Sequence, residues 1–142
     1  MMPLPDVEKG PLVQELRFII DRMRAAGSAD ERLFFFSAIY GAVKTLFVKS
    51  FDPTLVLAWH IANDSHTAIQ SLVKQRQEVS AGFLTEVMDR LLTLTEELAG
   101  CLTSGDVTKL YAVLEQLAVL AYSTTGNGRY LRERGILRFR DL

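Results

Sequence analysis

Arginine and aromatic residues alternate near the C-terminal end of the chain, and no other segment has as clear a chemical character. Residues 129–140 contain five arginines and one glutamate, so this segment carries +4 and the remainder carries −5 of the total of −1. Guanidinium groups bind phosphates and aromatic rings stack on bases, which is the combination that single-stranded nucleic acid requires. The candidate binding residues are Arg129, Tyr130, Arg132, Arg134, Arg138, Phe139 and Arg140.

Two other interpretations of this segment stay open. An acidic protein surface would attract the same arginines, and a solvated terminus would pair them with acidic residues of this chain or of a neighbouring subunit. No RNP, zinc-finger or helix-turn-helix signature accompanies the arginines. The segment therefore indicates RNA, single-stranded DNA or an acidic protein as a partner, or a solvated terminus whose arginines pair within the protein.

A glycine-rich stretch, TTGNGR at residues 124–129, precedes the arginine-rich segment. Such a turn before a helix N-terminus presents backbone amides to a phosphate, with Arg129 alongside. The Walker lysine and the preceding strand of a P-loop are both missing from the sequence. A glycine at a helix C-cap, followed by a turn, explains the same residues without a ligand.

His60 and Asp64 are the weak candidates for a metal site. They lie four residues apart, so on one helix they face the same way and could share a metal ion or a proton. His66 falls about 240° round the helix from His60, on another face. Neither HExxH nor the Glu-x-x-His pattern of di-iron bundles is present. An ordinary polar pair accounts for His60 and Asp64, and we expect no metal and no cofactor.

The single cysteine, Cys101, gives little support for catalysis. It lies in an apolar helical segment with no adjacent His or Lys, which is typical of a small core residue. One cysteine also excludes an internal disulfide and any multi-cysteine zinc site. Because the Gly-x-Ser-x-Gly elbow is missing as well, we expect a protein that is not an enzyme.

The elements that position these residues are helical throughout. Apolar residues recur at spacings of three and four, which predicts an all-α, single-domain bundle over residues 1–142. Short connections favour an up-and-down arrangement. The expected elements are an irregular lead-in over 1–10, five long helices over 11–26, 29–48, 53–78, 81–103 and 107–123, a short helix over 129–134, and a basic tail that completes the C-terminal segment 129–142.

Polar residues and prolines mark the expected helix boundaries. Pro11 suits a first helical position, and Ser28 with Glu31 matches a capping box. Asp52 followed by Pro53 starts the third helix in the same way. Residues 63–65 (NDS) prefer caps to helix interiors, so a break in the third helix is possible there.

Two helices have notable apolar patterns. The middle of helix 29–48, LFFFSAIYGAV, is apolar on nearly every face, so we expect it at the centre of the core or in an oligomer interface. Gly41 within it predicts close approach by a neighbouring helix. In helix 107–123 the residues expected to face inward are Leu110, Val113, Leu114, Leu117, Ala118 and Ala121.

Composition limits the class of protein. The chain has 142 residues, 49% of them apolar and 23% charged, which indicates a globular fold and not a disordered one. The net charge of −1 argues against a polycation that coats nucleic acid. No secretory signal is evident, and the most apolar stretch, 33–43, is shorter than the roughly 20 residues of a membrane span. We therefore expect a cytoplasmic protein without a membrane partner.

Three hypotheses follow. The first is a helical subunit of a larger assembly that contacts nucleic acid or an acidic partner through the arginine-rich segment. The small helical subunits of CRISPR effector complexes illustrate this role by analogy of size and class alone. The second is a homo-oligomeric interaction or scaffolding module, in which helix 29–48 and the tail form the interface. The third is a metal- or phosphate-binding helical protein.

Overall fold

The structure is a computed structural model that describes residues 6–136 of the chain. Within that range it contains helices and no strand, which confirms the all-α prediction and the arrangement of five long helices with a short last one. The helices are α1 (Asp6–Ala25), α2 (Ala29–Ser50), α3 (Pro53–Lys74), α4 (Ala81–Ser104), α5 (Val107–Ser123) and α6 (Gly126–Glu133), with a 3₁₀ turn, η1 (Arg76–Glu78), after α3.

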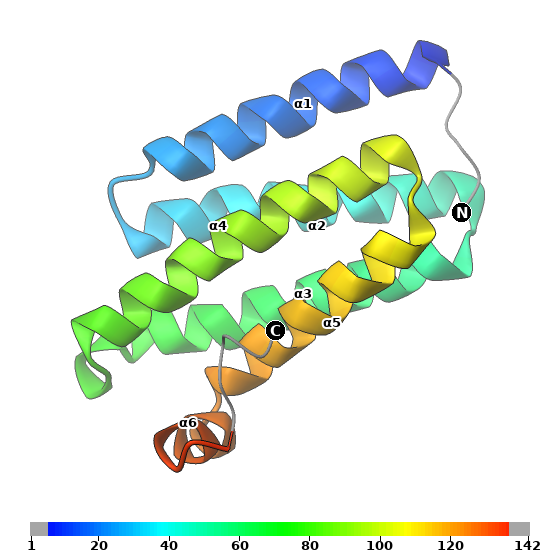
Figure 1. Ribbon diagram of the computed structural model, residues 1–142. Coiled ribbons are helices and arrows are strands. Elements are labelled where there is room, and N and C mark those ends of the chain that lie inside the picture. The colour runs from blue at the N-terminus through cyan, green and yellow to red at the C-terminus, as the bar shows by residue number, and fades with distance from the viewer. Residues whose placement is uncertain (1–5, 137–142) are drawn as a thin grey trace.

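The long helices form two layers with α1 at their edge. In Figure 1, α4 and α5 lie in front of α2 and α3, and α1 runs beside α2 and α4, with which it packs. The closest pairs are α2 with α3, α3 with α5, and α4 with α5. The short α6 lies at the end of the bundle beyond α5, away from α2 (Figure 1).

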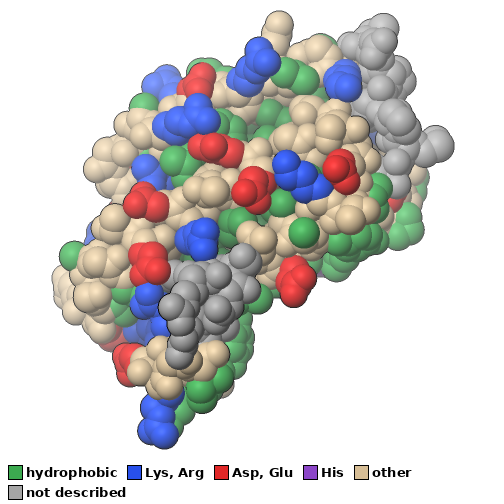
Figure 2. Space-filling view, viewed as in Figure 1, with side chains coloured by type: hydrophobic (Ala, Val, Ile, Leu, Met, Phe, Trp, Pro, Cys, Tyr) green, Lys and Arg blue, Asp and Glu red, His purple; other side chains and the backbone are tan. Residues whose placement is uncertain are grey.

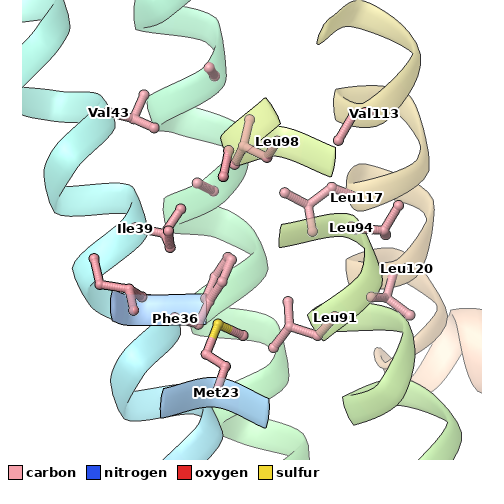
Figure 3. Close-up of a cluster of buried hydrophobic side chains, with 14 of the residues drawn as sticks. Met23, Phe36, Ile39, Val43, Leu91, Leu94, Leu98, Val113, Leu117 and Leu120 are labelled. Atoms are coloured by element: carbon pink, nitrogen blue, oxygen red, sulfur yellow. The ribbon is translucent and has the colours of Figure 1, made fainter. Parts of the chain in front are cut away.

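All five long helices contribute to one hydrophobic core. Figure 3 shows Met23 of α1, Phe36 of α2 and Leu91 of α4 pointing toward one another, and all three are inaccessible to solvent. Each buried side chain of this size stabilises the fold by about 1.5–3 kcal/mol relative to its exposed form. This core fixes the outward faces of the helices, which decide what the protein presents to partners.

The first helix begins earlier than the sequence predicts. α1 starts at Asp6 and not at Pro11, so the irregular lead-in is wrong for residues 6–10, while residues 1–5 lie outside the described residues. Pro11 lies inside the helix. Pro11 is the sixth residue of α1, so it removes a backbone hydrogen bond toward the preceding turn and the helix continues through it. The proline was therefore a weak boundary signal.

The predicted N-caps of the helices are confirmed, with one difference in the capping box. The Ser28 hydroxyl accepts from the Glu31 amide at 3.1 Å, as expected. The Glu31 carboxylate accepts from the Gly27 amide at 3.1 Å, one residue before the predicted partner. Asp52 likewise accepts from the Thr54 amide at 2.8 Å.

The third helix is continuous through residues 63–65, so a break at that point is wrong. Polar side chains there bond to the preceding turn of their own helix. The Ser65 hydroxyl donates to the Ile61 carbonyl at 2.7 Å, and the Thr67 hydroxyl donates to the Asn63 carbonyl at 3.1 Å. α3 instead ends at Lys74, four residues earlier than predicted, and continues as η1.

The helix ends show how the chain turns. α4 ends at Ser104 and is followed by Gly105, which has a φ of 73° in the left-handed region that glycine favours. α2 ends at Ser50, and Phe51 adopts the same conformation with a φ of 52°. For a residue with a side chain this costs about 1–2 kcal/mol. No pattern in the sequence predicts a phenylalanine in that conformation.

Helix α5 faces inward as expected except at Ala118, which is exposed. Leu114 and Leu117, which belong to the same apolar stripe, are buried. Ala118 lies at the edge of the stripe, where a small side chain is compatible with core and surface alike, so the apolar pattern is too wide by one position.

Candidate functional site

The arginine-rich segment begins at a tight corner between α5 and α6. α5 ends at Ser123 and α6 begins at Gly126, so residues 126–128 form the first turn of α6 and not a separate turn before it. The Thr125 hydroxyl accepts from the Gly128 amide at 3.1 Å and donates to the Tyr122 carbonyl at 2.7 Å. One side chain therefore joins the end of α5 to the start of α6.

Gly128 is required at this corner because no side chain fits. A Cβ built on Gly128 would lie 1.9 Å from the carbonyl oxygen of Tyr122 and 2.7 Å from its carbonyl carbon. Neither Gly126 nor Gly128 has a positive φ. The interpretation of these residues as a glycine C-cap and turn is wrong, since the glycine serves close approach of two backbones.

The same geometry bears on phosphate binding. The Gly128 amide, which a phosphate at this helix start would use, is already bonded to Thr125. Arg129 is half-buried, and its Nε is buried without a hydrogen-bond partner among the described residues. This guanidinium is held against the corner and does not extend into solvent beside the amides.

Arg132 fixes α6 to the body of the bundle. Its guanidinium forms an ion pair and hydrogen bond with the Glu86 carboxylate of α4. It also lies over the ring of Phe83, 4.8 Å from the ring centroid. Arg132 is thus engaged within the chain, as the solvated-terminus interpretation predicted for some of these arginines.

Tyr130 of α6 and Arg134, the residue that follows the helix, are both exposed. The Tyr130 side chain is 56% exposed, and the Arg134 guanidinium lies 5.7 Å from its ring centroid. An aromatic face and a cation are presented together on the same side of a helix. This pair has the geometry that stacks on a base and contacts a phosphate.

Charge is mixed over the surface around this site. Figure 2 shows Lys and Arg side chains next to Asp and Glu side chains over the visible face, with no continuous basic area. On this face, an anionic partner would therefore meet local clusters of basic side chains interspersed with acidic ones. Three of the predicted binding residues, Arg138, Phe139 and Arg140, lie outside the described residues.

The two histidines and Asp64 do not come together. His60 is exposed, and its ring centroid lies 4.8 Å from that of Trp59, while Asp64 is exposed one turn further along α3. His66 packs between α3 and α2, with its ring 6.3 Å from Phe36 and 5.3 Å from Tyr40. Burial there lowers the pKa of His66 below its ordinary value. Among the described residues, no group of three His, Cys, Asp or Glu side chains could hold a metal ion.

Cys101 is a buried residue of the core, as its surroundings in the sequence indicated. Burial raises the pKa of its thiol, and the nearby Asp106 and Glu97 add to this effect against Lys109. The thiol form is favoured, and its sulfur is out of reach of a substrate.

The outward face of α2 exposes apolar side chains, as a helix that is apolar on nearly every face would. The run of three phenylalanines divides by face, with Phe36 in the core, Phe35 half-buried and Phe34 68% exposed. Val48, further along the same side, is 51% exposed. A Cβ built on Gly41 would meet no atom within 4 Å, so the predicted close approach of a neighbouring helix is wrong within the described chain.

An aromatic cluster beside this face was also missed. The Arg22 guanidinium of α1 lies 5.4 Å from the ring centroid of Phe18 and 5.9 Å from that of Phe35. Phe18 is exposed on α1 although its neighbours Ile19 and Ile20 are buried. The arrangement depends on how α1 crosses α2, which periodicity within one helix does not contain.

Helix α2 also passes a test of length and composition for crossing a membrane. Its most apolar 18-residue window has a mean hydropathy of 1.3, and 22% of that window is buried. The longest stretch of α2 without a charged residue, residues 33–43, is shorter than a membrane span, whereas the 18-residue window tolerates the charged residues beside it. Helices in the cores of proteins that never enter a membrane satisfy the same criterion.

Comparison with protein-family models, with curated proteins and with solved structures gave no match for this chain. Its function is therefore inferred from its own residues and their arrangement.

Proposed function

We propose that the protein is a non-enzymatic helical subunit that binds single-stranded nucleic acid through the exposed side of α6 and the basic residues that follow it. The observation that carries the proposal is the pair of Tyr130 and Arg134, which offers an aromatic face and a guanidinium together at the surface. Stacking of a base on such a ring contributes about 1–3 kcal/mol, independent of base identity.

The position of α6 supports this role. It packs mainly against α5 at the end of the bundle and is held in place by Arg132, which bonds to Glu86. A fixed helix of this kind presents its outward residues without a large ordering cost on binding. The segment 129–140 adds Arg138 and Arg140 to the charge available for phosphates.

The residues with catalytic potential support a binding role in preference to an enzymatic one. His60 and Asp64 lie in the open on α3, whereas Cys101 is enclosed in the core. The thiol of Cys101 therefore lies apart from His60 and Asp64, and these residues do not bring a nucleophile and a base together.

The experiment is a titration of the full chain against a labelled oligouridylate and an oligothymidylate of equal length, at low and at physiological salt. We expect binding that weakens steeply as salt rises, because neutralised phosphates release counterions. The double variant Tyr130→Ala/Arg134→Ala should lose at least about fivefold in affinity. The matched control is Tyr111→Ala/Arg17→Ala, which removes an exposed tyrosine and an exposed arginine elsewhere.

Equal affinities of the Tyr130/Arg134 and control variants would refute the proposed site. Failure of the full chain to bind either oligonucleotide at low salt would refute the nucleic-acid role. If polyglutamate of matched charge displaced the oligonucleotides completely, the site would be assigned to an acidic protein instead.

A further inference from the structure

We propose that the protein forms a two-fold dimer in which the outward faces of α2 from two copies pack antiparallel. The face, here called the α2 seam, consists of Phe34, Ala38, Gly41, Thr45 and Val48. All five are uncharged, and all are exposed except Gly41, which is partly exposed. The proposal does not depend on nucleic-acid binding by α6.

The spacing of the α2 seam matches a helical partner. Its residues follow one another at intervals of four, three, four and three, the period with which two α-helices meet along a common line. The seam runs from residue 34 to residue 48, or about 21 Å of helix. Within that length the one charged residue is Lys44, which lies beside the seam with its ammonium over the Trp59 ring. The outward sides of α3 and α4, by contrast, carry charges such as Asp64, Lys74 and Asp89.

No described residue occupies the space above Gly41, as is also true of Gly10, Gly82 and Gly100. A glycine inside a helix costs about 1 kcal/mol relative to alanine, and here the space above it is empty to 4 Å. At the crossing point of two helices, the same space lets the backbones approach closely. A two-fold axis beside Gly41 would place Phe34 of each copy level with Val48 of the other, since both lie seven residues from it.

Charge at the two ends of α2 selects the occupant and its direction. The N-terminal turn carries Glu31, and the C-terminal turn carries Lys49. Centred on Gly41, these residues lie ten positions before and eight positions after the axis, so antiparallel pairing brings them within about 3 Å of the same level. Parallel pairing would place like charges together. A second copy of this chain therefore fits the face in one direction only.

The size of the seam sets the expected affinity. One helix face of this length is smaller than a standard specific interface, which buries about 800 Å² on each partner. We therefore expect a dissociation constant in the micromolar range. The measurement is sedimentation equilibrium of the full chain from about 1 µM to about 1 mM, which spans that range.

The variant Gly41→Arg tests the crossing point. In the proposed dimer it places two guanidinium groups together on the axis, so we expect a monomer throughout the concentration range. Gly100→Arg is the matched control, because Gly100 is also an exposed helical glycine with nothing within 4 Å of a Cβ. Gly100 lies on α4, away from the α2 seam, and we expect the Gly100→Arg variant to dimerise like the wild type. Circular dichroism and thermal melting verify that both variants fold.

Lys49→Glu tests the direction of pairing. The homodimer of this variant should be weakened by about two- to fivefold for each of the two pairs. A mixed dimer of variant and wild type should also be weaker than the wild type if the helices are antiparallel. It would be stronger if they were parallel, because Lys49 of the wild-type copy would then face the carboxylate introduced in the variant copy.

Three outcomes would overturn the proposal. The first is a wild-type chain that stays monomeric at every concentration, and the second is a dimer that survives Gly41→Arg. The third is flotation of the wild type with phosphatidylcholine vesicles, abolished by Gly41→Arg, without dimerisation in solution. That result would assign the seam to a lipid surface.

Discussion

Two helical glycines, Gly41 in α2 and Gly128 in α6, have opposite surroundings. A Cβ at Gly41 would meet no atom within 4 Å, whereas a Cβ at Gly128 would lie 1.9 Å from the carbonyl oxygen of Tyr122. At the α5–α6 corner the chain itself explains the glycine. Along α2 no described residue fills the corresponding space, which the proposed dimer assigns to a second copy. Empty space at a helical glycine is shared by Gly100 on α4, so the α2 seam is distinguished by its apolar neighbours and not by the glycine alone.

The two regions also differ in how their polar groups are used. At the corner, Thr125 bonds to both helices and Arg132 bonds across to Glu86, so the arrangement is closed. Among residues 6–136, the α2 seam has no polar side chain bonded to another helix. Its one hydroxyl, that of Thr45, donates at 3.0 Å to the carbonyl of Gly41 within the same helix. The corner should therefore be sensitive to substitution, and the seam should be tolerant in the monomer.

The largest effect is expected on the inner side of α2. Phe36→Ala should lower the free energy of unfolding by about 3–5 kcal/mol, because it leaves a cavity beside Met23 and Leu91. Phe34→Ala, two residues away on the seam, should change it by less than about 0.5 kcal/mol in the monomer. Urea denaturation at a concentration below dimerisation measures both. Similar losses for the two variants would show that the outward face is packed within one chain.

Gly128→Ala should have the next largest effect. The added methyl group collides with backbone, so α6 must shift away from α5 at a cost of about 1–3 kcal/mol. Gly126→Ala, two residues earlier in the same helix, meets nothing within 4 Å and should be neutral or slightly stabilising. Hydrogen exchange of the α6 amides reports the shift, and unchanged protection in Gly128→Ala would contradict the close approach.

Local patterns in the sequence were sufficient for the elements themselves. Helix periodicity and the caps Ser28 and Asp52 predicted where α2 and α3 begin, because a cap bonds to amides two or three residues away. The same reasoning failed at Pro11 and at residues 63–65, where a local preference is outweighed by continuation of the helix on both sides. Whether the local preference or the helix prevails depends on packing against other helices, and the sequence of one segment gives no information about that packing.

The candidate site was less predictable for the same physical reason. The sequence marked the arginines of α6 as a group, yet Arg132 bonds to Glu86, 46 residues away, and only Tyr130 and Arg134 form the exposed pair. The Gly-Asn-Gly pattern suggested a turn, whereas the requirement at Gly128 comes from the carbonyl of Tyr122. Which residues of a cluster reach solvent depends on their distances to residues far away in the sequence. Spacing along the chain does not reveal those distances.

A smaller effect is expected at Gly41 itself. Gly41→Ala should raise the free energy of unfolding of the monomer by up to about 1 kcal/mol, since alanine restricts the unfolded chain and nothing obstructs its methyl group. The same substitution on α4, Gly100→Ala, should stabilise by a similar amount. Only Gly41→Ala should also weaken dimerisation. Loss of monomer stability in Gly41→Ala would mean that a neighbouring helix does approach α2 at this position.

The smallest effect concerns the inner side of α2, where His66 packs against Phe36 and Tyr40. Burial lowers the pKa of His66 in the folded state, so below its ordinary pKa of about 6.5 the unfolded chain takes up the proton first. The free energy of unfolding should therefore fall as pH drops from about 7.5 toward 5 and level off below the folded-state pKa. His66→Gln should remove this part of the pH dependence, while His60→Gln, on the exposed side of α3, should retain it.

Urea denaturation between about pH 5 and 7.5 measures the difference between these variants, which is modest because His66 is only half-buried. If the free energy of unfolding changed equally with pH in the wild type and in His66→Gln, packing against α2 would not affect the protonation of His66.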